Sequence, residues 1–198
     1  MRLRCGMTFH DSDEDLMLRA GRGDTGAFEI LVERHQHAVV GTAAKMLGYT
    51  DGAEDIAQTV FLRAWKSAPR YRPEAKFTTW LMTITRNLVF NEFRRRNRSR
   101  LEPLESSTTA SEDSPARQIA DPSQPHAGAQ VTSRELTLAI DRALAALPEK
   151  PRMALILRRY EDMPYEEIAK ALGVSVPAVK SLLFRARTLL KEQLAEYL

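Results

Sequence analysis

The stretch YEEIAKALGVSVPAVKSLLFRARTLL, residues 165–190, has the clearest structural pattern in the chain. After Ser175, helical periodicity predicts a buried apolar stripe made of Val179, Leu182, Leu183, Ala186, Leu189 and Leu190. The opposite face is cationic and hydrogen-bonding, with Lys180, Ser181, Phe184, Arg185 and Arg187. Phe184 is therefore an aromatic ring among cations on the side of the helix expected to face solvent.

A second, shorter helix is predicted just before this one. Glu166 and Glu167 suit its N-terminus, where the helix dipole favours negative charge, and Gly173 suits the turn that ends it. Ser175 is expected to cap the following helix, with Pro177 in its first turn. Two helices joined by a tight turn, the second with a basic outer face, predict a helix-turn-helix whose second helix enters the DNA major groove. An ordinary helical hairpin is the alternative that this pattern leaves open.

Composition limits the class of protein. The 198 residues are 43% hydrophobic and 28% charged, which is enough apolar content to bury one or two cores. No apolar run approaches the roughly 20 residues of a membrane span, and the N-terminal residues lack the apolar core of a signal peptide. We therefore expect a cytoplasmic protein without membrane insertion.

Cysteine and histidine usage argues against a metal site. The single cysteine, Cys5, excludes an intrachain disulfide and a multi-cysteine zinc site. His35 and His37 are two residues apart and point to different helix faces, with no accompanying carboxylate-rich motif. We interpret both as surface histidines, and we expect no metal and no cofactor.

Charge and composition divide the chain into parts. Residues 101–133 contain four prolines, five acidic residues and one basic residue, with few large apolar side chains, so they cannot repay the entropy of ordering. We interpret them as a flexible linker between domains at 13–100 and 134–198, with residues 1–12 as a flexible N-terminus. Helical periodicity recurs on both sides of the linker, without strand alternation. The prediction is an all-α fold of two small helical domains, the C-terminal one a helix-turn-helix.

The stretch TDGAEDIAQTVFLRAWKSA, residues 50–68, follows helical spacing in the N-terminal part. Its core-facing stripe is predicted to consist of Ala53, Ile56, Ala57, Val60, Phe61, Ala64 and Trp65. The other face combines an exposed aliphatic side chain with hydrogen-bonding groups, namely Asp55, Gln58, Thr59 and Leu62. Such a face could bind a partner, and a solvated surface with one stray leucine is the alternative.

The next stretch, FTTWLMTITRNLVFNEFRRRNRSR, residues 77–100, joins an apolar face to a strongly basic end. Five arginines fall between Arg94 and Arg100, more than a helix C-terminus needs, so a phosphate-binding patch is plausible. Aromatic stacking and base-edge hydrogen bonding, as single-stranded DNA requires, are available from Trp80, Arg86, Asn87 and Asn91. By itself, a tryptophan such as Trp80 is more often part of a core.

Taken in order, these segments resemble a known family. GDTGAFEILVERH, TDGAEDIAQTVFLRAW, KFTTWLMTITRN, the Pro-rich linker and LPEKPRMALILRRYEDMPYEEIAKALGVSVPAVKSLLFRARTLL resemble the extracytoplasmic-function sigma factors of bacterial RNA polymerase. The resemblance covers about residues 13–100 and 134–192. It implies a protein that directs core RNA polymerase to specific promoters and assists promoter melting. The first domain would bind the clamp helices of the largest subunit and the melted minus-ten element, and the second would read the minus-thirty-five element as duplex.

The resemblance also implies roles for individual residues. Core-polymerase contacts fall on Asp55, Gln58 and Leu62. Minus-ten strand contacts fall on Lys76, Trp80, Arg86, Asn87, Asn91, Arg94 and Arg95. Minus-thirty-five contacts fall on Ser175, Lys180, Ser181, Phe184, Arg185 and Arg187. The flap region of the second polymerase subunit and an anti-sigma factor are further implied partners.

Three positions depart from the family's pattern. Thr59 stands where the family usually has glutamate, and Pro73 where a glycine is common before the promoter-contacting loop. Pro164 replaces the usual hydroxyl cap of the first helix in the DNA-reading pair, a cap that contributes about 1 kcal/mol.

Two other classes of function compete with this reading. A one-component helix-turn-helix transcription regulator would need a sensing or dimerising N-terminal domain, whereas this one ends in an arginine cluster beside Trp80 and Asn87. A DNA-processing enzyme would need a carboxylate cluster with metal spacing, a Gly-rich phosphate loop or a nucleophile pair, and the sequence has none of these. We therefore expect no catalytic residues and no enzyme activity.

Overall fold

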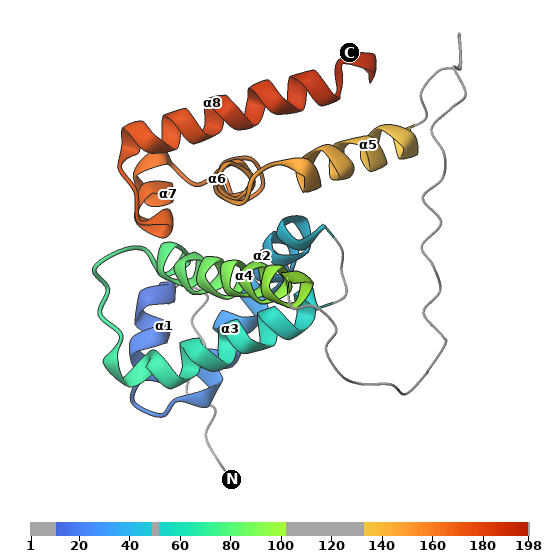
Figure 1. Ribbon diagram of the computed structural model, residues 1–198. Coiled ribbons are helices and arrows are strands. Elements are labelled where there is room, and N and C mark those ends of the chain that lie inside the picture. The colour runs from blue at the N-terminus through green and yellow to red at the C-terminus, as the bar shows by residue number, and fades with distance from the viewer. Residues whose placement is uncertain (1–10, 49–51, 102–132, 198) are drawn as a thin grey trace, which may run out of the picture.

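The computed structural model describes residues 11–48, 52–101 and 133–197 as helices joined by short turns (Figure 1). These ranges contain no strand, so the all-α prediction is confirmed. The expectations for Cys5, for residues 1–10 and for linker residues 102–132 lie outside the described ranges.

The first layer holds the N-terminal helices. Its elements are α1 (Asp13–Ala20), α2 (Thr25–Leu47), α3 (Ala53–Ser67), the 3-10 turn η1 (Ala68–Arg70) and α4 (Phe77–Leu101). Local capping explains several of the boundaries. The Ser12 hydroxyl accepts a hydrogen bond from the Asp15 amide at 3.1 Å, and the Asp24 carboxylate accepts one from the Ala27 amide at 3.1 Å. Helix α2 then ends at Gly48, whose left-handed φ of 78° suits a residue without a Cβ.

The second layer holds the C-terminal helices. Its elements are α5 (Ser133–Ala146), α6 (Glu149–Arg159), α7 (Tyr165–Leu172), α8 (Val176–Gln193) and the 3-10 turn η2 (Ala195–Tyr197). The predicted stripe of α8 is confirmed, because Val179, Leu183 and Ala186 are buried, and Leu182, Leu189 and Leu190 are partly buried. Pro164 stands at the N-cap of α7 without a side-chain cap hydrogen bond, as expected from its missing hydroxyl.

Helix α1 positions the start of α4. The Glu14 carboxylate accepts a hydrogen bond from the Phe77 amide at 2.8 Å, which satisfies one of the free amides at the α4 N-terminus. Asp13 accepts hydrogen bonds from His35 Nε2 at 2.6 Å and from Arg34 at 2.8 Å. The His35 ring also packs on Phe77, with centroids 5.2 Å apart. The surface interpretation is therefore right for His37, which is exposed, and wrong for His35, which is partly buried because it joins α1 to α2.

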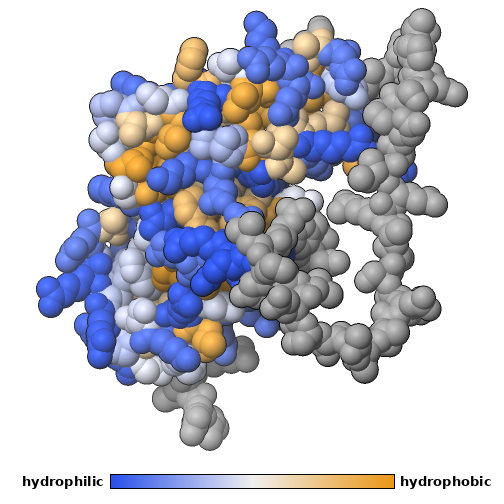
Figure 2. Space-filling model, viewed as in Figure 1, coloured by the Kyte–Doolittle hydropathy of each residue, from blue (hydrophilic) through white to orange (hydrophobic). Residues whose placement is uncertain are grey.

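The two layers pack directly against each other. Helix α4 contacts α7, and α2 contacts both α5 and α6. Buried residues of both layers form one continuous apolar cluster, from Leu31 and Met46 on one side to Leu157 and Ile168 on the other. Figure 2 shows hydrophilic side chains over much of the visible surface, with apolar patches mostly over the C-terminal layer in the upper part of the view. Nothing in the sequence pattern predicted this contact between the layers.

Candidate nucleic-acid interface

The helix-turn-helix is formed by α7, the turn at Gly173 and α8. Gly173 has a φ of 64°, and the Val174 amide reaches back to the Ala169 carbonyl at 3.0 Å, which closes the end of α7. The Ser175 hydroxyl accepts a hydrogen bond from the Ala178 amide at 3.3 Å, and Pro177 lies in the first turn of α8. The predicted turn and cap are therefore confirmed.

The outer face of α8 presents the predicted duplex-reading residues to solvent. Lys180, Ser181, Arg185 and Arg187 are exposed, and Phe184 keeps 74% of its surface accessible. Its neighbour Leu183 is only 1% exposed, so these two adjacent residues lie on the buried face and the exposed face of α8. The structure brings all of these side chains onto one helix, together with the exposed cap Ser175. A ring and cations on one accessible face can contact thymine methyl groups, base edges and phosphates.

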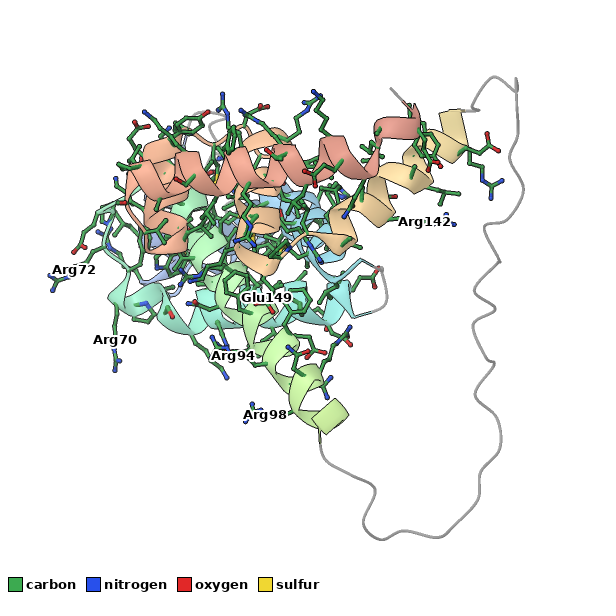
Figure 3. The ribbon with its side chains drawn as sticks, turned by 45° about the horizontal axis from the view of Figure 1, so that its top comes forward. Arg70, Arg72, Arg94, Arg98, Arg142 and Glu149 are labelled. Carbon is green, nitrogen blue, oxygen red and sulfur yellow. The ribbon has the colours of Figure 1, made fainter. Side chains whose placement is uncertain are left out.

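The arginine-rich end of α4 is only partly free. The Glu92 carboxylate accepts hydrogen bonds from Arg95 Nε and Nη2, both at 2.9 Å, and from Arg96 Nε at 2.7 Å. The hydrogen bonds from Arg95 lower the pKa of Glu92, and the same pair raises the pKa of Arg95. Figure 3 shows Arg94 and Arg98 extending away from the helix. A polyanion would therefore meet Arg94 and Arg98 first, while Arg95 must exchange a carboxylate for a phosphate.

Asn87 and Arg86 are linked to each other. Asn87 is exposed, and its Oδ1 accepts hydrogen bonds from Arg86 Nε at 3.1 Å and from Nη2 at 2.6 Å. Arg86 is partly buried, and desolvation lowers its pKa. The side-chain amide of Asn87 is thus held in one orientation by its neighbour, which leaves its donor end for a ligand.

Trp80 belongs both to a core and to a cavity wall. Its ring packs edge-on to Tyr71 at 5.1 Å between centroids and lies 5.8 Å from Phe77, in an aromatic cluster. The same residue is only partly buried and lines a cavity of about 440 Å³. The other walls of this cavity are Lys66, Ser67, Arg70, Tyr71, Arg72, Glu74, Ala75, Thr79, Thr83 and Lys170. Trp80 therefore packs in an aromatic core and also forms part of the wall of the cavity.

The sequence reasoning missed the cations of this cavity. Lys66 is exposed in the last turn of α3, and Arg70 and Arg72 are exposed in the α3–α4 connection, where Figure 3 shows both arginines pointing outward. Lys76 is exposed just before α4, and its carbonyl accepts a hydrogen bond from the Trp80 amide at 3.1 Å. A run of cations shortly before Trp80 is the sequence feature that could have predicted a basic cavity beside this ring.

The outer face of α3 is exposed as predicted. Asp55 and Gln58 are exposed, Leu62 keeps 53% of its surface accessible, and the core-facing stripe of the helix is buried or partly buried. Thr59 donates its hydroxyl hydrogen to the Asp55 carbonyl at 2.8 Å, so it makes a local bond where a longer acid would project. Gln58 lines a groove of about 440 Å³ between α2 and α3, together with Val32, Gln36, His37, Val40, Glu54, Ala57 and Phe61.

The predicted minus-ten residues fall into two groups. Trp80 lies at the cavity beside the α3–α4 connection, whereas Asn91 and Arg95 line a separate groove between α3 and α4. Asp55 and Thr59 line that second groove as well. The structure therefore brings two predicted strand-binding residues next to a predicted polymerase-binding residue, and it separates them from Trp80.

Neither a membrane span nor a metal cluster is found in the described part of the chain. None of its helices has a segment both long and apolar enough to cross a bilayer. Over the same residues, no three His, Cys, Asp or Glu side chains come together in a way that could hold a metal ion.

Two family models match the chain, and they divide it as the helices do. One is described as Sigma-70 region 2 and matches residues 31–99, and the other is described as Sigma-70, region 4 and matches residues 137–190. Among curated relatives, the RNA polymerase sigma-H factor of Pseudomonas aeruginosa is 31% identical, over 91% of this chain and 93% of the relative. The ECF RNA polymerase sigma-E factor of Escherichia coli K12 is 32% identical, over 89% of this chain and 91% of the relative.

Solved structures with the same fold include two complexes. CnrH in complex with the cytosolic domain of CnrY aligns with a TM-score of 0.68 and 26% identity, over 94% of this chain and 99% of the other. The sigma factor RpoE in complex with the anti-sigma factor NepR, from Bartonella quintana, aligns with a TM-score of 0.63 and 24% identity, over 85% and 96%.

Proposed function

This chain belongs to the extracytoplasmic-function group of the sigma-70 family of RNA polymerase sigma factors, and we propose that its two helical units divide promoter recognition between them. Residues 13–100 form the unit that binds core polymerase and captures the minus-ten strand. Residues 134–198 form the unit that reads the minus-thirty-five element as duplex. As a sigma factor, the chain directs core polymerase to promoters in transcription initiation.

Core polymerase binds the outer face of α3 in this proposal. The exposed positions of Asp55, Gln58 and Leu62 support it, because an accessible leucine between hydrogen-bonding side chains is the mixture that protein interfaces use. The groove beside Gln58 extends this face onto α2. Its partner is the pair of clamp helices of the largest subunit, and the flap region of the second subunit contacts the C-terminal unit.

The minus-ten strand binds along the cavity beside Trp80 and the neighbouring cations. Melting a base pair costs a few kcal/mol, and a protein that does not use ATP must recover that cost by binding the extruded strand. Tyr71 and Trp80 give the cavity aromatic walls, and Lys66, Arg70 and Arg72 give it positive charge for flanking phosphates. Asn87 offers its amide donor to a base edge, and Arg94 binds the backbone further along α4.

The minus-thirty-five element binds the outer face of α8. Lys180, Arg185 and Arg187 would contact phosphates or base edges, Ser181 would hydrogen-bond beside them, and Phe184 would lie against a thymine methyl or a sugar. Ser175 places the N-terminus of α8 at the duplex through its cap. This contact would account for the exposure of Phe184 in the free protein.

An anti-sigma factor remains among the proposed partners, and RpoE of Bartonella quintana is bound to a partner of that kind in its solved complex. We also propose that the chain is not an enzyme and acts in the cytoplasm, as expected of a transcription initiation factor. One observation supports the proposal most: the chain combines an exposed basic helix face that carries Phe184 with a separate aromatic, cationic cavity beside Trp80, and the two surfaces suit duplex and single-stranded DNA respectively. A one-component regulator needs only the first.

A titration of core RNA polymerase with the fluorescently labelled full chain tests the proposal. We expect saturable binding of one chain per core, and promoter binding that depends on core polymerase. If the chain instead binds its DNA site as a dimer without core polymerase, and shows no affinity for core, the regulator interpretation replaces the sigma-factor one.

A further inference from the structure

Helix α1 carries none of the proposed core or DNA contacts, yet it touches both ends of the segment that forms the cavity beside Trp80. It contacts η1, where the α3–α4 connection begins, and α4, where that connection ends (Figure 1). Residues 71–76 lie between these two ends without a helix or a strand. They line the cavity with Tyr71, Arg72, Glu74 and Ala75. The placement of α1 therefore affects the shape of this cavity.

The N-terminus of α4 has no cap from the residue that precedes it. Lys76 comes directly before the helix, and its carbonyl accepts the first helical hydrogen bond, from the Trp80 amide. An acceptor side chain and negative charge are favourable at this position, whereas an ammonium group only donates and is positive. The Glu14 carboxylate of α1 supplies both, because it accepts a hydrogen bond from the Phe77 amide at 2.8 Å. A carboxylate 63 residues before Phe77 thus replaces the local cap.

Glu14 lies on a helix that is itself fixed in place. Its neighbour Asp13 accepts hydrogen bonds from Arg34 and His35, which tie α1 to α2. Leu16 and Met17 on the inner face of α1 are completely buried. The acceptor for the α4 amide therefore belongs to a rigid, packed element.

The other end of the connection lies against the backbone of Gly21. A Cβ at this position would lie 2.4 Å from the Ala68 carbonyl oxygen and 3.0 Å from its carbonyl carbon. Gly21 has an ordinary helical φ of −63°, so glycine is required here for space. Ala68 begins η1 and is buried, and η1 leads directly to Arg70 and Tyr71 in the cavity wall. The close contact with α1 therefore sets where this wall lies.

Tyr71 depends on the same packing for its position. Its hydroxyl is buried and has no hydrogen-bond partner among the residues that the structure describes. The ring packs edge-on to Trp80 and to Phe77, with centroids 5.1 and 6.3 Å away. Burial, and then the charges of Glu14 and Asp13, raise the pKa of Tyr71 to about 12, so the phenol is neutral and close to the acidic first turn of α1. A shift of Phe77 would therefore move both aromatic walls.

We propose that Glu14 and Gly21 of α1 are positioning residues for the minus-ten strand, since Glu14 fixes the first turn of α4 and Gly21 sets the place of η1. The aromatic and cationic walls of the cavity then keep the spacing that an unstacked base requires. The exposed Lys76 side chain can contact a phosphate, because another helix completes the α4 N-terminus. The inference rests on the proposed strand binding in this cavity, and it gives α1 a part in that binding.

Substitution of Glu14 tests one end of the connection. Glu14→Ala removes the acceptor and the charge, and Glu14→Gln keeps an acceptor. Asp15→Ala is the matched control, because it removes the same charge from an exposed neighbour that bonds to Ser12 within the same turn. Each variant is assembled with core polymerase and titrated with a fluorescent single-stranded oligonucleotide that carries the minus-ten sequence selected from random promoters. We expect Glu14→Ala to weaken oligonucleotide binding about fivefold to twentyfold, Glu14→Gln to recover most of the loss, and Asp15→Ala to stay within about twofold of the wild type.

Gly21→Ala tests the other end, with Gly26→Ala as its control. A Cβ added at Gly26 would make only an ordinary contact, with Asp24 Oδ1 at 3.5 Å, whereas at Gly21 it would overlap the Ala68 backbone. We expect Gly21→Ala to weaken binding of the same oligonucleotide about tenfold, and Gly26→Ala to change it by less than about twofold.

Core affinity separates positioning from a general loss of structure. Neither Glu14 nor Gly21 belongs to the outer face of α3, so every variant should bind core polymerase within about twofold of the wild type. Wild-type oligonucleotide binding by both Glu14→Ala and Gly21→Ala would overturn the proposal. So would a parallel loss of core and oligonucleotide binding without rescue by Glu14→Gln, which would indicate a structural role alone. If the wild-type holoenzyme does not bind the oligonucleotide, the strand-binding function proposed for the cavity is itself wrong.

Discussion

Phe184→Ala separates a role in DNA reading from a role in folding. The side chain keeps 74% of its surface exposed, so about 50 Å² of a ring of roughly 200 Å² is buried in the free protein. At about 25 cal/mol per Å², that burial contributes about 1 kcal/mol to folding, and the better helix propensity of alanine offsets about half of it. The free energy of unfolding should therefore change by less than about 1 kcal/mol.

The effect on DNA should be larger. Burying the remaining surface of roughly 150 Å² against base and sugar edges is worth about 3–4 kcal/mol before the costs of ordering. A net loss of about 1–3 kcal/mol in discrimination remains, or roughly 5-fold to 150-fold in relative affinity. Fluorescence anisotropy with a selected minus-thirty-five duplex and its scrambled counterpart measures this ratio for the full chain bound to core polymerase.

Leu183→Ala is the control for the opposite behaviour. Its side chain is 1% exposed, so truncation should cost about 2–5 kcal/mol of unfolding free energy through lost burial and a cavity. If Phe184→Ala kept the wild-type ratio between selected and scrambled duplexes, the ring would have no part in reading. A large loss of stability in Phe184→Ala would equally refute the reasoning, since it would mean that the ring is buried.

Three further predictions concern the N-terminal unit. Asp55→Ala with Gln58→Ala should weaken core-polymerase binding in a direct titration while leaving DNA binding by α8 intact, and unchanged affinity would remove both residues from the interface. Asn87→Ala should spare core binding but reduce thymine reactivity to permanganate on a duplex promoter, with much of the loss restored on a premelted template; full reactivity on duplex would exclude a role in melting. The hydrogen bond from His35 holds the pKa of Asp13 below its ordinary value of 3.8, so the stabilisation is present above about pH 5 and lost as pH falls through the lowered folded value. Urea unfolding between about pH 7 and pH 3 should therefore show a steeper loss of stability for the wild type than for Asp13→Asn, and parallel profiles would contradict this assignment.

The elements that the sequence predicts well are those whose causes are local. The stripe of α8 follows from a 3.6-residue period, and the turn before it follows from Gly173 and Ser175, so both are correct to the residue. The pairing of Glu92 with Arg95 is equally local, because residues three apart face each other on a helix. It could have been predicted from the sequence, and it divides the arginine cluster into paired and outward-pointing members.

The contacts between the layers could not be predicted in this way. Arg152 reads in sequence as one more surface cation of a basic chain, and only the fold brings it under Met46 and the end of α5. Thr79 and Glu167 are 88 positions apart, and no periodicity relates them. The cavity beside Trp80 has the same origin, because its walls come from the end of α3, the α3–α4 connection, the start of α4 and one residue of α7. These features depend on long-range packing, which neither composition nor local periodicity predicts.

Run-off transcription is the most direct test of the sigma-factor account. Purified core polymerase would be combined with the full chain on a library of random promoter sequences, and the start sites would be sequenced. We predict discrete start sites that require the chain, downstream of sequences enriched for two short elements separated by a fixed spacer. Start sites that are the same with and without the chain, or none at all despite tight binding of the chain to core polymerase, would contradict the account.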